Sequence, residues 1–227
     1  MYASIQRGTE SGVYDHTIDA VTSKIERDDL CGPPANAEGW RDLGQIHSAP
    51  LSNVRSLSTL YIYYKFGDSA TDTWSIEYRF RIPPIAGFQP SDRATAIILY
   101  DDLGRGSLDM SYTWNEYGRP AIYTAMSVGA KVSNGEVDAI YHGGDISYAT
   151  GYMAVWDFYL DMMSPIAGQT IYLTTVGNHE TDWPGSPSYY QGTDSGGECG
   201  VPATKLIPMP YPATTNEPWW SYEVVDC

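Results

Sequence analysis

Segments at three places in the chain carry oxygen-bearing side chains beside glycine, a combination suited to holding metal cations. Glycine lets the backbone approach an ion closely, and carboxylate, amide and phenolate oxygens bind hard or borderline cations. Any one segment is explained by the preference of Asp, Asn and Gly for turns. Their repetition favours a metal site, and they are Asp101-Asp102-Leu103-Gly104, Gly143-Gly144-Asp145-Ile146-Ser147-Tyr148 and Gly177-Asn178-His179-Glu180.

The candidate metal ligands in these segments are Asp102, Asp145, Tyr148 and Asn178. Tyrosine suits a ferric ion, which can hold the phenol deprotonated near neutral pH. Two metals about 3.5 to 4 Å apart could share a carboxylate, clamp a phosphate ester and activate water. Such cations would also invert the local field of a chain that carries a net charge of −15. The same charge disfavours binding to nucleic acid by electrostatic attraction.

The histidines are few, and one of them adjoins the candidate ligands. His179 could donate a hydrogen bond to a phosphoryl oxygen, and the alternative is a histidine that caps a turn. We expect His142 to pack behind the site without touching metal. His16 and His47 lie in the first part of the chain and are predicted to have no part in catalysis.

Each of the three segments follows a predicted strand. The apolar run of residues 94–100 predicts a strand buried on both faces, and residues 137–142 and 171–176 predict two more strands. Helical spacing over 120–132 and 152–163 places a helix between each pair of strands. Alternating strands and helices predict a largely parallel sheet, which binds ligands beyond the carboxyl ends of its strands.

The first third of the chain has a different pattern. Residues 58–66 and 73–82, with a turn at 67–69, predict an antiparallel pair of strands with one face in water. Few strands are indicated over residues 1–56. Pro83-Pro84 and the breakers that follow them predict a linker, with a domain boundary near Phe88.

Cysteine content and hydropathy narrow the class of protein. Cys31, Cys199 and Cys227 are too few for a disulfide scaffold, and their odd number leaves at least one unpaired within the chain. Pairing beyond the chain and ordinary free thiols both remain open. No stretch approaches the roughly 20 apolar residues of a membrane span, and the first residues lack the pattern of a signal peptide. We therefore expect no membrane anchor and no leader in this chain.

The three segments, in this order, resemble the first three of the five metal-ligand blocks of the purple acid phosphatases, within the calcineurin-like metallophosphoesterases. Other stretches are similar to the large plant-type members called nucleotide pyrophosphatase/phosphodiesterase-like, namely residues 27–36, 39–44, 146–152 and 195–202. The resemblance covers nearly the whole chain and is most specific over residues 100–180.

The resemblance implies a role for each candidate residue. Asp102 and Tyr148 would hold a ferric ion, Asp145 would bridge both metals, and Asn178 would hold a divalent zinc, manganese or iron ion. His179 would contact the substrate phosphate as the catalytic histidine, and Asn178 would also adjoin the substrate. The implied activity is that of a metal-dependent acid phosphatase, in which activated water attacks the phosphorus of a phosphate ester.

The resemblance also implies an α/β fold in two parts. Residues 1–88 would form a partial fibronectin type III-like β-sandwich, and residues 89–227 the N-terminal half of a metallophosphoesterase α/β/β/α sandwich. The family is commonly secreted or vacuolar, which is the localisation that the resemblance implies. Neither the sequence nor the resemblance predicts an oligomeric state.

The chain departs from the family pattern after Glu180. The family's two later blocks supply three metal-binding histidines, yet His179 is the last histidine here. We therefore expect a truncated chain with little or no hydrolase activity, an exposed apolar sheet face and poor solubility. The alternative is a noncatalytic β-sandwich binding module with a vestigial metal site. A serine hydrolase is disfavoured because the chain has no Gly-x-Ser-x-Gly motif.

Overall fold

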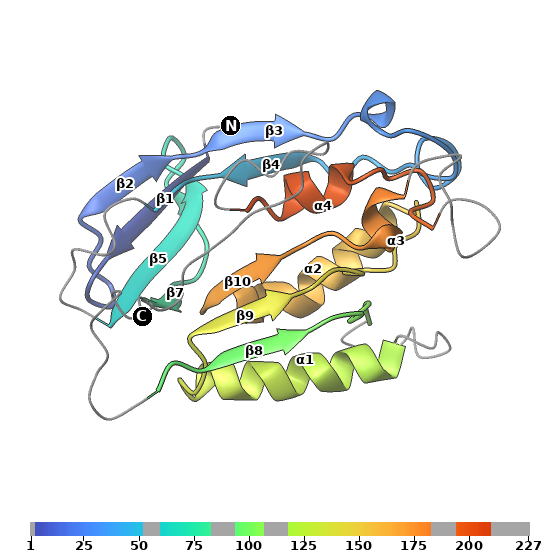
Figure 1. The fold of residues 1–227 in the computed structure, drawn as a ribbon. Helices are drawn as coiled ribbons and strands as arrows, with labels where there is room; N and C mark the ends of the chain where they lie inside the picture. Colours follow the sequence, from blue (N-terminus) through green and yellow to red (C-terminus); the bar gives the residue numbers. More distant parts are fainter. Residues whose placement is uncertain (1–2, 52–59, 83–93, 107–117, 183–193, 210–227) are drawn as a thin grey trace.

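The candidate site segments belong to a parallel sheet with helices on one face. The computed structural model describes residues 3–51, 60–82, 94–106, 118–182 and 194–209. In this part of the chain the sheet has the order β10-β9-β8, formed by Ile171–Thr174, Ala139–His142 and Ile97–Tyr100, and both pairings are parallel. The predicted parallel sheet is confirmed, and its carboxyl ends meet at one edge (Figure 1).

Two long helices cover one face of this sheet (Figure 1). They are α1 (Gly118–Ser133) and α2 (Ala154–Ala167), which confirm the two predicted helices. α2 continues past residue 163 and contains Pro165. Trp156 and Tyr159 of α2 are almost fully buried, and their core also includes Ile122 of α1. These apolar stripes position the sheet and hence the ends of its strands.

The opposite face of β8 is open to solvent. Ile98 and Tyr100 pack against the helical core, whereas Ile97 is 44% exposed and Leu99 is 75% exposed. The prediction that residues 94–100 form a strand buried on both faces is therefore wrong. The run is apolar throughout, but successive side chains of a strand point to opposite faces, and only one face meets α1 and α2.

The N-terminal part is an antiparallel sheet. β1 (Ala3–Gly8) lies between β2 (His16–Asp19) and β5 (Tyr61–Asp68), and β5 also pairs with β6 (Thr73–Trp74) and β7 (Tyr78–Arg81). The predicted antiparallel pair is confirmed, although β5 continues through residues 67 and 68 of the predicted turn and residues 73–82 form two strands. The ladder is interrupted where the backbone N–H of Phe66 donates to the Ser75 hydroxyl at 3.1 Å.

The strands that the sequence pattern did not predict are short. β3 (Val21–Lys24) pairs with β4 (Gln45–Ser48), so the described residues of 1–56 hold four strands where few were expected. β3 is mostly exposed on both faces, which leaves no alternation to detect. The remaining short elements are η1 (Arg27–Asp29), α3 (Asn178–Thr181) and α4 (Val201–Leu206).

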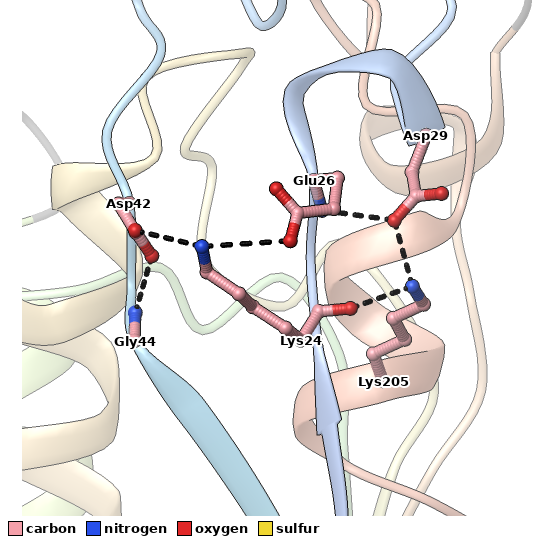
Figure 2. Close-up of polar contacts among 6 residues, drawn as sticks. All are labelled: Lys24, Glu26, Asp29, Asp42, Gly44 and Lys205. Atoms are coloured by element: carbon pink, nitrogen blue, oxygen red, sulfur yellow. Dashed lines mark hydrogen bonds and ion pairs between the residues drawn. The ribbon is translucent and has the colours of Figure 1, made fainter.

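Residues 24–44 contact the α/β part directly. Ile25, Leu30 and Ala35 belong to the same buried core as α1 and α2. Figure 2 shows polar contacts of the same segment, in which the Lys205 ammonium of α4 donates to the Lys24 carbonyl at 2.9 Å and lies 2.8 Å from an Asp29 carboxylate oxygen. Lys24 in turn pairs with carboxylates at 2.9 and 3.4 Å, those of Asp42 and Glu26. These exposed pairs fix geometry more than they stabilise the fold.

A disulfide and one hydrogen bond link segments that are far apart in the sequence. Cys31 and Cys199 form a disulfide, with Cα atoms 6.1 Å apart, so the pairing left open by the sequence is settled for these two. The Tyr64 hydroxyl donates to the Gly168 carbonyl at 2.8 Å.

The predicted domain boundary near Phe88 falls outside the described residues. None of the described helices has the length and hydropathy needed to span a membrane.

Candidate metal centre

The ends of β8 and β9 bring three of the predicted ligands together. The Tyr148 hydroxyl donates to a carboxylate oxygen of Asp102 and lies 3.4 Å from the Oδ2 atom of Asp145. Backbone bonds hold the two loops in register, from the Asp102 N–H to the Gly144 carbonyl at 3.2 Å and from the Gly104 N–H to the Ile146 carbonyl at 3.1 Å. The convergence expected from the parallel sheet is therefore present.

The end of β10 joins the same cluster through α3. The backbone N–H of His179 lies 3.3 Å from the Oδ1 atom of Asp145. The buried carboxylate of Glu180 accepts hydrogen bonds from the backbone N–H groups of Asp145, Ile146 and Gly177 at 2.8 to 2.9 Å. Glu180 was not singled out from the sequence, although it ends the segment that contains Asn178 and His179.

Backbone conformation marks the same residues. Asp102, Asp145 and Tyr148 have φ angles of 55°, 50° and 51°, in the left-handed region that non-glycine residues seldom adopt. Such conformations cost on the order of 1 to 3 kcal/mol each and gather at functional sites. The fold therefore holds three of the four predicted ligands in an unfavourable backbone conformation.

Negative charge is concentrated in the cluster. Burial and the neighbouring Asp102 carboxylate raise the pKa of Asp145, although the His179 backbone bond opposes the shift. Burial also raises the pKa of Glu180 to about 7. Carboxylates packed this closely repel one another, and a bound cation would favour their ionised forms.

Asn178 and His179 are both held by Asp194, which lies on the loop before α4. The Asn178 side-chain N–H donates to the Asp194 Oδ2 atom at 3.0 Å, and the Nδ1 atom of His179 lies 3.1 Å from the Asp194 carbonyl oxygen. The imidazole ring of His179 also packs on Tyr148, with ring centroids 4.6 Å apart. Sequence reasoning missed Asp194, because no spacing links it to residues 15 and 16 positions earlier.

His142 packs behind the cluster, as predicted. Its Nδ1 atom lies 2.7 Å from the Tyr172 hydroxyl and 3.2 Å from the Tyr159 hydroxyl. Burial lowers the pKa of His142 to about 4, so the imidazole is neutral at physiological pH. His16 lies in β2 and His47 in β4, away from the three loops.

The donor set fits a hard cation. Carboxylate and phenol oxygens of Asp102, Asp145 and Tyr148 lie within hydrogen-bonding reach of one another, and a cation would replace the proton that Tyr148 now shares. Among the described residues no three His, Cys, Asp or Glu side chains are grouped as a metal site. The group of three oxygen ligands therefore depends on Tyr148, which joins the carboxylates of Asp102 and Asp145.

Comparison with known proteins gives relatives that span a longer chain. No family model matches the sequence. The chain is 35% identical over 93% of its length to a probable inactive purple acid phosphatase 27 of Arabidopsis thaliana, and 35% identical over 67% to a nucleotide pyrophosphatase/phosphodiesterase of Hordeum vulgare. These matches cover 34% and 40% of the relatives.

A solved structure agrees over almost the whole chain. The purple acid phosphatase from yellow lupin (Lupinus luteus) seeds superposes with a TM-score of 0.83 and 33% identity, covering 98% of this chain and 38% of the lupin chain. The sequence and the fold of the described residues therefore point to the same relatives, of whose length this chain spans about a third.

Proposed function

Because the chain belongs to the purple acid phosphatase family, we propose that Asp102, Asp145, Tyr148 and Asn178 form part of a binuclear metal centre for phosphate-ester hydrolysis. The observation that carries the proposal is the Tyr148 hydroxyl, placed within reach of both the Asp102 and Asp145 carboxylates. A shared cation would offset the repulsion between these acidic side chains, and their gathering at loops with left-handed backbone conformations supports the proposal.

Each residue has a distinct task in this proposal. Asp102 and Tyr148 would hold the ferric ion, Asp145 both metals, and Asn178 a zinc, manganese or divalent iron ion. When bound, the metals would supply Lewis-acid charge and activated water. His179 would donate to a phosphoryl oxygen through Nε2 in its protonated form, because the Asp194 carbonyl engages Nδ1 and Nε2 carries a hydrogen as well only in the imidazolium.

The proposal also covers the fold of the N-terminal part, the class of substrate and the localisation of the protein. The N-terminal antiparallel sheet would belong to a fibronectin type III-like sandwich, and the substrate would be a phosphate monoester, a diester or a nucleotide pyrophosphate. Secretion or vacuolar targeting is supported by the Cys31–Cys199 disulfide, since disulfides persist in oxidising compartments.

The isolated chain is expected to have weak activity or none. It spans about a third of relatives that include a probable inactive purple acid phosphatase 27, and it contains no histidine after His179. The second candidate is therefore a noncatalytic binding module that retains a vestigial metal site. Three of the relatives are named as probable inactive purple acid phosphatases, which favours this alternative.

Ferric loading of the purified chain tests the proposal. We expect a visible tyrosinate-to-iron charge-transfer band in the wild type. The band should be lost in Tyr148→Phe, because that change removes only the phenolic hydroxyl. The matched control is Tyr152→Phe, an exposed tyrosine on the same loop, which should keep the band. Absence of any band in the wild type contradicts the proposed centre.

Turnover separates the two candidate functions. With iron and zinc added together, the catalytic proposal requires at least slow hydrolysis of a chromogenic phosphomonoester, dependent on both metals. If the charge-transfer band is present but no hydrolysis is measured, the result supports the noncatalytic alternative.

A further inference from the structure

The loop of residues 194–200 carries contacts to the candidate site that no ligand motif accounts for. Within the described residues, Asp194 bonds to two neighbouring site residues through different groups: its carboxylate accepts from the Asn178 side chain at 3.0 Å, and its backbone carbonyl lies 3.1 Å from the Nδ1 atom of His179. Asp194 is only 7% exposed. One residue is thus in contact with both side chains assigned to the divalent metal and the phosphate.

The chemistry of these contacts fixes orientation. An ionised carboxylate only accepts hydrogen bonds, so it faces the NH₂ end of the Asn178 carboxamide and leaves the oxygen at the opposite end. A carbonyl also only accepts, so the Nδ1 atom of His179 carries the hydrogen in the neutral imidazole. Metal ligands and phosphate donors depend on this kind of orientation by a second layer of residues.

The loop itself is firmly held. The Asp194 N–H donates to the Asp182 carboxylate at 2.9 Å, and the Gly200 N–H donates to the Glu180 carbonyl at 2.7 Å. The buried carboxylate of Glu198 accepts from the Gly151 backbone N–H at 2.8 Å and from the Trp156 indole at 3.0 Å. The Cys31–Cys199 disulfide adds a covalent tie. Asp194 is therefore presented by a rigid support.

We propose that Asp194 is a positioning residue of the metal centre, whose carboxylate turns the Asn178 oxygen toward the divalent metal and whose carbonyl sets the His179 tautomer. The proposal rests on the proposed function for the tasks of Asn178 and His179. The contacts themselves exist without metal, so they can be tested separately.

Side-chain nuclear magnetic resonance of the metal-free chain gives the first test. We expect Asp194→Ala to shift the Asn178 side-chain amide resonance and speed its exchange with solvent, and Asp194→Asn to restore much of both because its carbonyl still accepts. In the wild type the neutral His179 ring should carry its hydrogen on Nδ1. An unshifted Asn178 amide in Asp194→Ala, or a hydrogen on Nε2 alone, overturns the proposal.

Binding of Mn²⁺, followed by calorimetry, gives the second test. Asp194→Ala should weaken Mn²⁺ binding about 10 to 100-fold, and Asp194→Asn should recover part of the loss. Because Asp194 acts through Asn178, adding Asp194→Ala to Asn178→Ala should cause little further loss. Fully additive losses overturn the proposal.

A control variant on the same loop distinguishes a loss of Asn178 orientation from a general destabilisation of the loop. Ser195→Ala removes the hydroxyl that donates to the Asp182 carbonyl and accepts from the Gly197 N–H. This variant should bind Mn²⁺ like the wild type, and an equal loss in Ser195→Ala and Asp194→Ala overturns the positioning role. If the wild type takes up no Mn²⁺, the proposed function fails, while the resonance test still decides whether Asp194 orients Asn178.

Discussion

At the residue scale, buried acids are the least expected feature of the chain. Glu180 and Glu198 are each 1% exposed, and each accepts hydrogen bonds that join separate loops. Nothing in their spacing distinguishes them from surface acids, because their burial depends on how distant loops fold together. By contrast, Asp102, Asp145 and Asn178 could be singled out because glycines accompany them at predicted strand ends.

Glu198 should make stability depend on pH. Burial raises the pKa of Glu198 from its ordinary value of 4.5 to about 8, although bonds from Gly151 and Trp156 oppose the shift. Between these values the unfolded chain releases a proton that the folded chain retains, so the free energy of unfolding falls as pH rises, by up to about 1.4 kcal/mol per pH unit. This stabilisation is complete below pH 4.5 and lost by about pH 8.

Urea unfolding at several pH values checks this prediction. Glu198→Gln cannot ionise, so its free energy of unfolding should fall less steeply than that of the wild type between pH 4.5 and 8. Glu180 keeps its own contribution in both proteins, so some slope remains. The exposed acid Glu38 provides the matched control, and Glu38→Gln should leave the wild-type slope unchanged. Parallel curves for Glu198→Gln and the wild type would show that Glu198 does not titrate in this range.

At the scale of elements, long periodic segments could be predicted and short ones could not. The apolar runs and helical stripes that became β8, β9, β10, α1 and α2 carry clear periodic signals. Their parallel order also predicted that the candidate ligands would meet at one edge. β3 and β4 have four residues each and pair only with one another in the described part of the chain, so their formation depends on tertiary context.

The close approach of two strand ends predicts a sensitive glycine. A Cβ atom on Gly177 would lie 2.0 Å from the Asp145 Oδ1 atom and 2.7 Å from its backbone nitrogen. Gly177→Ala should therefore separate the loops after β9 and β10, destabilise the chain by about 1 to 3 kcal/mol and weaken Mn²⁺ binding. Thermal unfolding and calorimetry measure the two effects.

A second glycine supplies the control for this substitution. Gly129 lies within α1, and a Cβ atom there would meet only the Ile166 side chain, at 3.3 to 3.4 Å. Alanine favours the helix by about 1 kcal/mol over glycine, so Gly129→Ala should be neutral or stabilising and leave Mn²⁺ binding unchanged. Equal behaviour of the two variants would contradict the steric argument at Gly177.

At the scale of the whole molecule, the second face of the sheet is open at β8, whereas Ala139 of β9 and Leu173 of β10, on the same face, are buried. α1 and α2 bury Ile98 and Tyr100, while Ile97 and Leu99 project from the other side of β8. An apolar face of this kind is a hazard for aggregation. The sequence predicted such a face from the family resemblance, but assigned the strand itself to a fully buried environment.

Reducing the apolar surface at Leu99 should improve solubility. Leu99→Thr keeps a residue suited to strands and removes apolar area where the side chain is 75% exposed. We expect a larger soluble fraction and less light scattering than in the wild type. Leu103→Thr is the control, since Leu103 is 6% exposed and its substitution should lower stability instead. Unchanged scattering in Leu99→Thr would show that this face does not drive association.

The disulfide between Cys31 and Cys199 makes most of the polypeptide a closed ring, because the two cysteines are 168 positions apart. A single protease nick at any point inside that ring leaves both pieces covalently attached. Nicked molecules would therefore keep the mobility of one chain on a gel without reductant and separate into fragments only after the sulfur bond is reduced.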